Sequence, residues 1–541
     1  MFSFNLVDEP WIPCRLIGGN PQSITLLDLQ DAFRLSPSIQ AIAGENPLVT
    51  ISIHRLLLAI LHRVLAGPRN ADEWGMLKKA DCWDEAKLLE YLQRWKSRFD
   101  LFDEQYPFYQ TPGLDFSREM SVARLRMDNF NTLFDHTFDD APPELSPAEA
   151  ARLLIAYQSF DTGGIKTGDT GRDFADSSPL LQSAVCLVRG QNLFQTLLFN
   201  LHHYSAEDGE PFSFDPNKDK PSWERDETVR PADRFPEGYL DLLTWQSRRL
   251  RLHPQLQADG KVIISRAVLM KGYQFPDDFT RSNKETMVAF RKRLKAETIA
   301  SAWATVGFEP GKSLWRDSQA LFQSISDQRE RPKMLTWLYD LSANGFLNRT
   351  QILPVEFFGL TADQAKLLFW RHETLPVTLE YLGSKTLIQQ LGLALSLADK
   401  VAEQLRLAQR LLGAKLLSSS ENRKPLGSDI TAITEHLASE PIYWSQLETY
   451  FKQLLTDLPN DQSQDEEGET VYGVCVLAEW ARVLKRTAED AFQIATRSLD
   501  GSSRALKAVA IAQNSFNHKL RDVLKTYLET NNQTELTGGQ Q

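Results

Sequence analysis

The C-terminal third of the sequence carries the pattern that most constrains the fold. Between about residues 384 and 527, apolar residues recur every three or four positions in four successive segments. This spacing gathers them on one face of a helix, and such a face needs neighbouring helices to cover it. Polar loops join the segments, which is typical of helices that reverse direction and pack together. We therefore predict an antiparallel four-helix bundle at residues 379–530.

The ends of these helices also follow from the sequence. Ser384 is placed to cap the first helix, which we expect to end at Gly413. The other three helices are expected at about 443–457, 474–499 and 503–527. The polar tail, residues 531–541, is expected to be disordered.

Residues 1–378 have a different, mixed texture. Residues 46–66 are apolar on most sides, as in a buried helix, whereas KVIISRAVLM (261–270) is typical of a strand. Long polar connections at about 98–146 and 205–236 separate such elements. We predict an α+β fold, with a large mixed α/β N-terminal domain at 1–378 followed by the helical bundle.

Composition narrows the class of protein. The 541 residues are 42% hydrophobic and 24% charged, which is ordinary for a globular protein with a sizeable core. No apolar run approaches the roughly 18 residues of a membrane span. The N-terminus carries Asp8 and Glu9 and does not resemble a signal peptide. The four cysteines form no CxxC pair, which favours free thiols and argues against structural zinc. We expect a cytoplasmic protein with no membrane association.

The net charge of −11 does not favour a protein that binds nucleic acid alone, because such proteins usually carry a basic surface. Basic residues nevertheless cluster locally, at 248–251, 281–295 and 329–333. A local basic face therefore stays open as an interpretation.

The stretch FDTGGIKTGDTGRDF, residues 160–174, contains four glycines. Asp169 stands where a Walker A loop requires lysine, and no dinucleotide-binding GxGxxG is present. Glycine has no Cβ to keep another backbone at a distance, and its amides can donate to phosphates or base edges. Two interpretations stay open: a loop that a ligand backbone approaches closely, or a mobile surface loop.

Motifs for catalysis are absent from the sequence. It contains no HExxH pattern, no GxSxG elbow and no carboxylates at nuclease spacing. His202 and His203, near Cys186, suggest a Cys/His dyad of a hydrolase. In most backbone conformations, however, the side chains of two adjacent residues point in opposite directions. We expect a protein that is not an enzyme and that has no catalytic residue, no metal and no cofactor.

The segment GLTADQAKLLFWRHE (359–373) is predicted to form an amphipathic helix capped by Thr361. Gln364 would then project from the exposed first turn. Its amide offers both a donor and an acceptor, so it could reach the edge of a base pair.

Several segments, taken in order along the chain, resemble the CasA family, the large subunits of the type I-E CRISPR complex Cascade. NLVDEPWIP (5–13) is similar to the family's N-terminal signature, and YPFYQTPGL (106–114) to its aromatic-Pro-Phe-x-Gln-Thr segment. NTLFDH (131–136) resembles the loop that bears an exposed phenylalanine. The glycine stretch, VRG (188–190), TADQAKLLFWRHE and the helical bundle follow in the family's order. The specificity lies in this order, because no single motif suffices.

The resemblance implies a subunit that recognises a protospacer-adjacent motif (PAM) in double-stranded DNA and starts strand separation for pairing with guide RNA. It implies partnership with the other Cascade subunits and crRNA, and recruitment of a helicase–nuclease after the R-loop forms. The residues that it places at the DNA or PAM are Gly163, Gly164, Lys166, Gly168, Lys271, Asp363, Gln364 and Ala365. It also gives Asn131 and Phe134 a loop contact to the complex or to DNA. Glycines entering a narrow minor groove imply loose readout and tolerance of several PAM sequences.

The chain departs from the family's pattern at two points. Asp363 stands where some relatives carry Asn, and its charge would repel phosphate. The chain also lacks a cysteine cluster that some relatives carry before the segment LMKGYQF, which contains Lys271, so no metal is expected there.

Two hypotheses compete with that of a DNA-binding subunit. One is a scaffold protein without direct DNA readout, in which the bundle and the acidic surface organise partners. The other is a hydrolase that uses His202 or His203.

Overall fold

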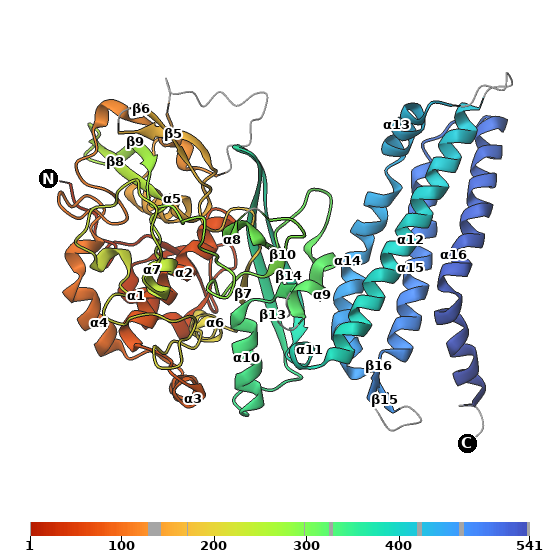
Figure 1. Ribbon diagram of the computed structural model, residues 1–541, viewed down its shortest axis with the longest axis horizontal. Helices are drawn as coiled ribbons and strands as arrows, with labels where there is room; N and C mark the ends of the chain where they lie inside the picture. Colours follow the sequence, from red (N-terminus) through yellow and green to blue (C-terminus); the bar gives the residue numbers. More distant parts are fainter. Residues whose placement is uncertain are drawn as a thin grey trace. The chain divides into compact units, whose positions relative to one another are not determined.

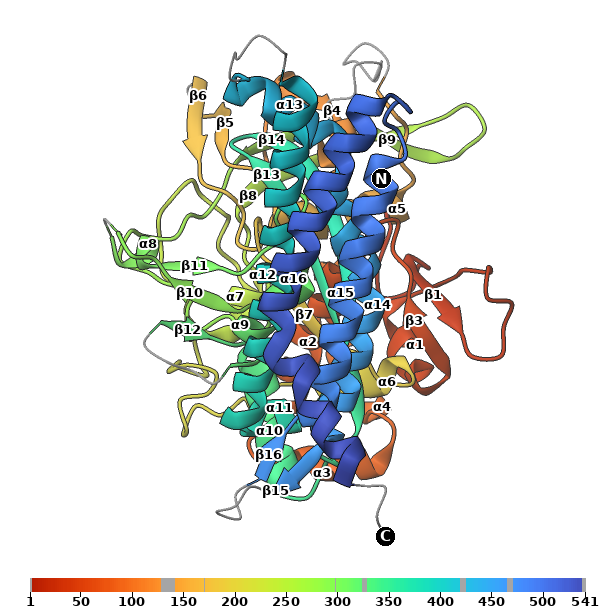
Figure 2. The ribbon, with the colours of Figure 1, turned by 90° about the vertical axis from the view of Figure 1, so that its right-hand side faces the viewer.

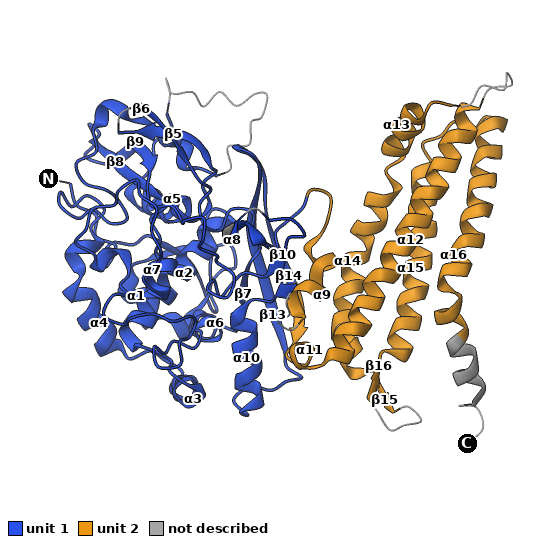
Figure 3. Ribbon diagram, viewed as in Figure 1, with its two compact units in different colours: residues 1–309, 324–374 blue, residues 310–323, 375–541 orange. Residues whose placement is uncertain are grey.

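The computed structural model describes residues 2–127, 142–169, 171–296, 298–323, 328–418, 425–464 and 470–537. The chain forms two compact units (Figure 3). Unit 1 comprises residues 1–309 and 324–374, and unit 2 comprises residues 310–323 and 375–541. The main part of unit 2 thus begins close to residue 379, where the helical bundle was predicted to start. Unit 2 also contains residues 310–323, which the prediction placed in the N-terminal domain.

Unit 1 mixes helices with small sheets. Its helices are α1 (Leu29–Arg34), α2 (Pro47–Leu65), α3 (Ala71–Ala80), α4 (Glu85–Arg94), α5 (Pro147–Phe160), α6 (Leu193–Asn200), α7 (Tyr239–Leu243), α8 (Ile299–Ala302) and α10 (Lys333–Ala343). Short 3₁₀ helices are η1 (Ser36–Ser38), η2 (Lys96–Phe99), η3 (Phe116–Arg118), η4 (Val122–Leu125) and η5 (Ser222–Glu224).

The strands of unit 1 form several separate sheets. One has the order β2-β1-β3, from Thr25–Leu27, Ile12–Leu16 and Ile39–Ile42. The largest has the order β4-β9-β5-β6, from Met120–Ser121, Val262–Lys271, Gly164–Gly168 and Gly171–Ala175, with β8 (Arg248–Leu256) also on β9. A third joins β14 (Lys366–Thr378), β13 (Ile352–Asp363) and β7 (Val185–Val188). The short strands β11, β10 and β12 pair at Trp303–Thr305, Phe290–Lys292 and Arg329–Glu330.

Helix α2 is a buried helix of unit 1, as predicted for residues 46–66. Asn46 caps it by accepting from the N–H groups of Leu48 and Val49, and Pro47 occupies its first position. The helix is long and apolar enough to cross a membrane by composition alone, but core helices meet the same test, and most of α2 is buried inside the protein. Its continuous apolar surface is therefore explained by packing on all sides.

Unit 2 is built mainly from long helices that lie side by side (Figure 2). Helix α12 packs against α14, α15 and α16, and α15 also packs against α14 and α16. The helices are α9 (Ser318–Phe322), α11 (Glu380–Gly383), α12 (Lys385–Leu417), α13 (Gly427–Leu437), α14 (Ser439–Asp457), α15 (Val474–Thr496) and α16 (Ser503–Thr537). Shorter elements are η6 (Leu314–Asp317), η7 (Leu458–Asn460) and the hairpin of β15 (Gln462–Gln464) and β16 (Thr470–Tyr472).

The ends of two helices differ from those expected. Ser384 caps α12 by accepting from the N–H of Leu387, as predicted, but the helix passes Gly413 and ends at Leu417. A Cβ at Gly413 would lie 3.5 Å from Ile430 of α13, so this glycine lies at a close helix contact and not at a helix end. Helix α16 continues to Thr537 and includes much of the tail that was expected to be disordered.

The predicted helix at 359–373 is wrong, because this segment forms a β-hairpin. β13 and β14 are the longest strands of unit 1 and are joined by a two-residue turn at Gln364 and Ala365 (Figure 1). Along the first half of β14, exposed and half-buried residues alternate, which is the two-residue period of a strand. Thr361 lies within β13, where its hydroxyl donates to the Phe308 carbonyl over 2.8 Å and caps no helix.

Candidate nucleic-acid interface

The glycine stretch forms a β-hairpin that belongs to the largest sheet. β5 pairs with β6 from Gly164 opposite Ala175 to Gly168 opposite Gly171, and β5 also pairs with β9. Gly164 and Gly171 have φ angles of +127° and +146°, which glycine adopts readily and other residues rarely do. The sequence interpretation of a mobile surface loop is replaced by a hairpin anchored on a sheet.

Two arginines hold the end of this hairpin. Arg118 donates to the carbonyl oxygens of Gly168 and, over 2.8 Å, of Asp169. Arg249 donates from Nη1 to Oδ1 of Asp169 over 2.9 Å. These contacts fix the backbone of the turn and neutralise the one carboxylate at its tip.

Lys166 points to a buried carboxylate. Its Nζ lies 2.7 Å from Oδ2 of Asp161, and Nε of Arg248 lies 2.6 Å from the same oxygen. Burial lowers the pKa of Lys166, although the attraction of Asp161 opposes that change. The Lys166 side chain is only 16% exposed, so in this conformation it supports the base of the hairpin and reaches no ligand outside.

The turn between β13 and β14 lies against the glycine hairpin. A Cβ built on Gly164 would lie 3.7 Å from the Cβ of Ala365. Asp363 and Gln364 are exposed beside it, and Gln364 has a φ angle of +52°, in the left-handed region. Gln182 supports the strand below by donating from Nε2 to the Ala362 carbonyl over 2.7 Å.

Between the two hairpins lies a cleft of about 770 Å³, which we call the basic cleft. Its charged lining consists of five cations and one carboxylate: Arg124, Arg126, Lys166, Arg172, Lys366 and Asp161. Arg124 and Arg126 come from η4 and the residue after its end, Arg172 from β6, and Lys366 from the start of β14.

Four of these cations form no ion pair with a residue that the structure describes. Lys166 is paired with Asp161, but the other four side chains form no ion pair or hydrogen bond with any residue in the described ranges. Four unpaired positive charges around one cleft repel each other, and a polyanion would relieve that repulsion. The chain as a whole has a net charge of −11, so this cleft is a local exception.

The residues singled out from the sequence fall into three groups. Lys166 and Ala365 line the basic cleft, and Gly164 lies against Ala365. Asp363 and Gln364 directly precede Ala365 in the chain. The lining does not include Gly163, Gly168 or Lys271. Asn131 and Phe134 lie outside the described residues, so their predicted loop contact stays a prediction.

The three residues outside the lining have local roles. A Cβ at Gly163 would lie 3.0 Å from the Ser177 nitrogen, and one at Gly168 would lie 3.0 Å from the Asp173 Cβ. Both positions are therefore close-packed within the hairpin itself. Lys271 ends β9 with its Nζ 3.9 Å from Oδ1 of Asp173, and it is 20% exposed.

Sequence reasoning missed the unpaired cations. Arg172 lies inside the glycine stretch, and Lys366 follows Gln364 by two positions, so both stood in segments already singled out. Arg124 and Arg126 lie in the segment RLRM, which has no pattern that links it to either hairpin. Only the fold brings these four side chains together.

The histidine pair has structural contacts. His202 is buried, its Nδ1 lies 2.7 Å from the His203 carbonyl oxygen, and burial lowers its pKa to about 3. The His203 ring stacks on Trp337 at 5.1 Å. Cys186 is buried as well, and burial raises the pKa of its thiol, which disfavours the thiolate that a nucleophile needs. These contacts give the hydrolase hypothesis no support.

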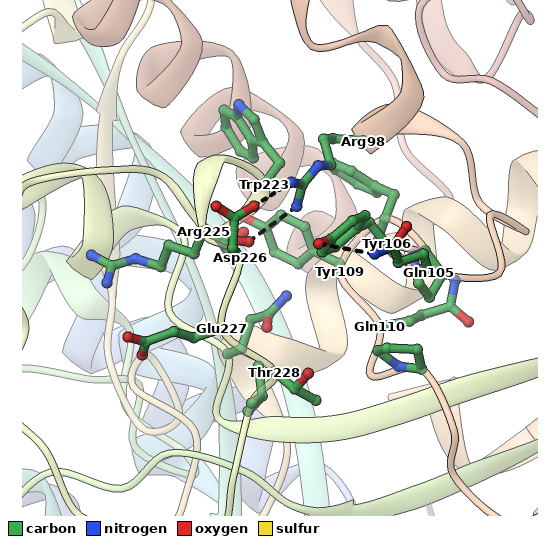
Figure 4. A pocket seen from close by; sticks show the side chains of 16 residues that line it. Arg98, Gln105, Tyr106, Tyr109, Gln110, Trp223, Arg225, Asp226, Glu227 and Thr228 are labelled. Carbon is green, nitrogen blue, oxygen red and sulfur yellow. Dashed lines mark hydrogen bonds and ion pairs between the residues drawn. The ribbon is translucent and has the colours of Figure 1, made fainter.

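A separate polar pocket is small, and some of the side chains that line it contact one another (Figure 4). It has a volume of about 50 Å³. The Arg98 guanidinium lies 3.4 Å from the centre of the Tyr106 ring and is paired with Asp226. Within the described residues, no group of three or more His, Cys, Asp or Glu side chains is arranged to hold a metal ion.

The chain matches known proteins over nearly all of its length. A family model described as CRISPR-associated protein Cse1 matches residues 5–491. CRISPR-associated protein CasA/Cse1 of Thermus thermophilus is 28% identical over 532 residues, which cover 96% of this chain and 98% of that protein. The crystal structure of Thermus thermophilus CasA aligns with a TM-score of 0.76 at 25% identity and covers 96% of this chain and 100% of that one.

One further structure shows the same fold at lower identity. A chain from a structure described as a CRISPR RNA-guided surveillance complex aligns with a TM-score of 0.72 at 19% identity, over 95% of this chain and 99% of that one. The mixed α/β architecture is thus shared with Cse1 structures, and the resemblance drawn from the order of motifs is confirmed. Since the family model covers far more than half of its residues, this chain belongs to the CRISPR-associated Cse1 family.

Proposed function

We propose that this chain is the large, non-catalytic subunit of a type I-E CRISPR surveillance complex, and that it binds double-stranded DNA in the basic cleft. There it recognises a PAM and starts the strand separation that lets guide RNA pair with its target. Family membership supports the role of a large subunit. The observation that carries the DNA-binding part is the set of four cations that form no ion pair with any described residue, around one cleft of an acidic protein.

The two hairpins on either side of the cleft have complementary roles in this proposal. The glycine hairpin offers a backbone with few side chains, held at its tip by Arg118 and Arg249, and such a backbone fits a narrow groove. The four cations contact phosphates on either side of it, which positions the duplex without reading its sequence.

Strand separation is assigned to the turn of the β13–β14 hairpin. Gln364 projects from a two-residue turn, at the end of two long paired strands. A hairpin of that length is stiff, so a side chain at its end can be pushed beside the first base pair. The small neighbour Ala365 leaves room for the duplex. The exposed Asp363 makes no phosphate contact in this proposal, because its charge would repel one.

The proposed partners are the other Cascade subunits and crRNA in the cytoplasm, with a helicase–nuclease recruited after the R-loop forms. The shared fold with a chain of an RNA-guided surveillance complex supports this assembly. The long helices of unit 2, with their exposed polar faces, are our candidate surface for recruitment.

A double charge reversal separates DNA binding from a pure scaffold role. Arg172→Glu with Lys366→Glu places a negative charge on each side of the cleft, and Lys218→Glu with Lys261→Glu makes the same change at exposed lysines elsewhere. We expect the cleft variant to assemble with its partner subunits and crRNA but to lose PAM-dependent duplex binding by at least about 100-fold, since several phosphate contacts are lost. The control should bind normally. If the cleft variant assembles and still binds target DNA, the scaffold hypothesis is favoured.

A further inference from the structure

One face of β14 connects the basic cleft with a second cavity. Because side chains alternate along a strand, Lys366, Leu368, Trp370 and His372 lie on the same face. Lys366 lines the basic cleft, whereas Trp370 and His372 line a separate pocket of about 310 Å³. Leu368 and Trp370 are each 37% exposed, and His372 is 38% exposed at its side chain. The face therefore forms a continuous exposed path between the two cavities.

The second cavity, which we call the tryptophan pocket, has a flat aromatic wall. The His372 ring stacks on Phe358 with centroids 4.4 Å apart and an interplanar angle of 10°. Trp370 stands two residues away on the same face of β14. Phe358 is buried in β13 and supports His372 from below, so the wall is held in place before any ligand arrives.

The lining of the tryptophan pocket also supplies polar groups. His54 of α2 lines it and is buried, and burial lowers its pKa to about 4, so the ring is neutral at pH 7. Its Nδ1 lies 2.8 Å from the Thr50 carbonyl oxygen and must carry the proton, which leaves Nε2 as an acceptor. No residue in the described ranges forms a hydrogen bond with that Nε2.

The charged lining consists of two arginines and two glutamates, Arg15, Arg189, Glu45 and Glu356, and Glu45 is paired with Arg152. Arg189 is paired with Glu356 over 3.0 Å, which places a donor and an acceptor side by side. Arg15 lines the pocket, is exposed and forms no ion pair with any described residue. A flat aromatic wall, a neutral acceptor, a donor–acceptor pair and a cation without an ion-pair partner among the described residues match a nucleotide: a heteroaromatic base with polar edges and a phosphate.

We propose that the tryptophan pocket receives a base of single-stranded DNA that has left the duplex at the basic cleft. This inference rests on the proposed function, since only strand opening supplies an unpaired base here. From Lys366 to Trp370 the strand rises about 13 Å, so no more than about four nucleotides at duplex spacing separate the two sites. A base stacked on Trp370 would hold the displaced strand and oppose its return to the duplex.

The test compares two DNA probes on the full-length protein at low salt. One probe is a fully paired duplex, and the other is the same duplex with eight unpaired nucleotides on one strand, one of them the fluorescent base 2-aminopurine. Trp370→Ala removes the stacking surface, and Trp370→Phe keeps an aromatic ring. Ile352→Ala, at a position 49% exposed on β13 and outside the pocket lining, is the matched control for truncating an exposed apolar side chain of the same sheet.

We expect Trp370→Ala to weaken binding of the forked probe about ten-fold, as for loss of one stacked base, and to leave the paired duplex unchanged. Quenching of 2-aminopurine should disappear in Trp370→Ala and persist in Trp370→Phe. Ile352→Ala should behave like the wild type with both probes, and all variants should have similar melting temperatures.

The outcomes separate the two proposals. If Trp370→Ala binds the forked probe as the wild type does, with unchanged quenching, the pocket does not receive a base, while the DNA-binding cleft stands. The same conclusion follows if Trp370→Ala disrupts only assembly with neighbouring subunits, because the pocket then binds protein. If neither probe binds the wild type, or if charge reversal in the cleft leaves the binding of both probes unchanged, the proposed function itself fails.

Discussion

Gln364 has a backbone conformation that residues other than glycine seldom adopt, with a φ angle of +52°. Sequence reasoning singled out this residue for its exposed amide, and the structure leaves it exposed, but at a hairpin turn and not in the first turn of a helix. The error is instructive, because a Thr followed three residues later by Gln is the pattern of a helix cap. The run of strand-forming residues that follows, with two aromatic residues in KLLFWRHE, forms a strand whose side chains alternate between exposed and half-buried.

Two variants separate the effect of the Gln364 amide from the effect of its backbone strain. Gln364→Ala and Gln364→Gly both remove the amide, but glycine also removes the cost of the left-handed conformation. If the amide acts on the opening base pair, both variants should keep PAM-dependent duplex binding and slow strand separation to a similar extent.

Permanganate reactivity of unpaired thymines, measured beside binding on the same targets, checks this. A negatively supercoiled target should partly rescue both variants, because supercoiling favours opening. Equal loss of binding and opening would mean that Gln364 reads the PAM or supports the turn. Normal opening in Gln364→Gly alone would mean that the strain, and not the amide, controls the step.

At the scale of elements, the glycine hairpin shows why four glycines occur together. Gly163 and Gly168 are close-packed inside the hairpin, whereas Gly164 and Gly171 have positive φ angles. The glycines therefore have a role in the fold in addition to any role in ligand binding. A variant at one positive-φ glycine has to be compared with a variant at the other, because both introduce the same backbone strain.

Gly164→Ala and Gly171→Ala provide that comparison. Both changes put a side chain on a backbone with φ above +120°, so each should lower the free energy of unfolding by about 1–3 kcal/mol. The added methyl at 164 would lie 3.7 Å from the Cβ of Ala365, which lines the cleft, whereas no described atom lies within 4 Å of one at 171. We expect Gly164→Ala to weaken duplex binding clearly more than Gly171→Ala, at similar melting temperatures. Equal effects on binding would assign both glycines to the fold alone.

Elements with strong internal periodicity could be predicted from the sequence. Helix α2 and the Ser384 cap of α12 follow from local patterns, and the long helices of unit 2 lie close to the expected ranges. Helix α13 was not predicted. It packs against α12 at Gly413, so this glycine allows a close contact between the two helices and does not end α12. The residues that pack against a glycine are often far from it in the sequence. A glycine inside a helix and a glycine at its end therefore look alike in the local sequence.

At the scale of the whole molecule, the charge is divided unevenly. The formal net charge is −11, yet the basic cleft brings together four cations without anionic partners among the described residues. The order of motifs was enough to identify the family. The cleft was not predictable in the same way, because Arg124 and Lys366 are brought together by folding across some 240 positions of the chain.

If the basic cleft binds duplex DNA through phosphate contacts, that binding depends steeply on the salt concentration. The cleft variant replaces Arg124, Arg126, Arg172 and Lys366 with glutamine, and the control replaces the exposed Lys79, Lys218, Lys261 and Lys507 with glutamine. Both variants lose the same charge, so a general effect of net charge cancels between them.

The measurement is the slope of log K against log salt for duplex binding by the full chain. Each phosphate contact contributes about −0.9 to that slope, so the cleft variant should have a slope about 3 to 4 units less steep than that of the wild type. The control variant should keep the wild-type slope. Equal slopes for the two variants would contradict the account, since the four cations of the cleft would then contribute no more to binding than any other surface lysines.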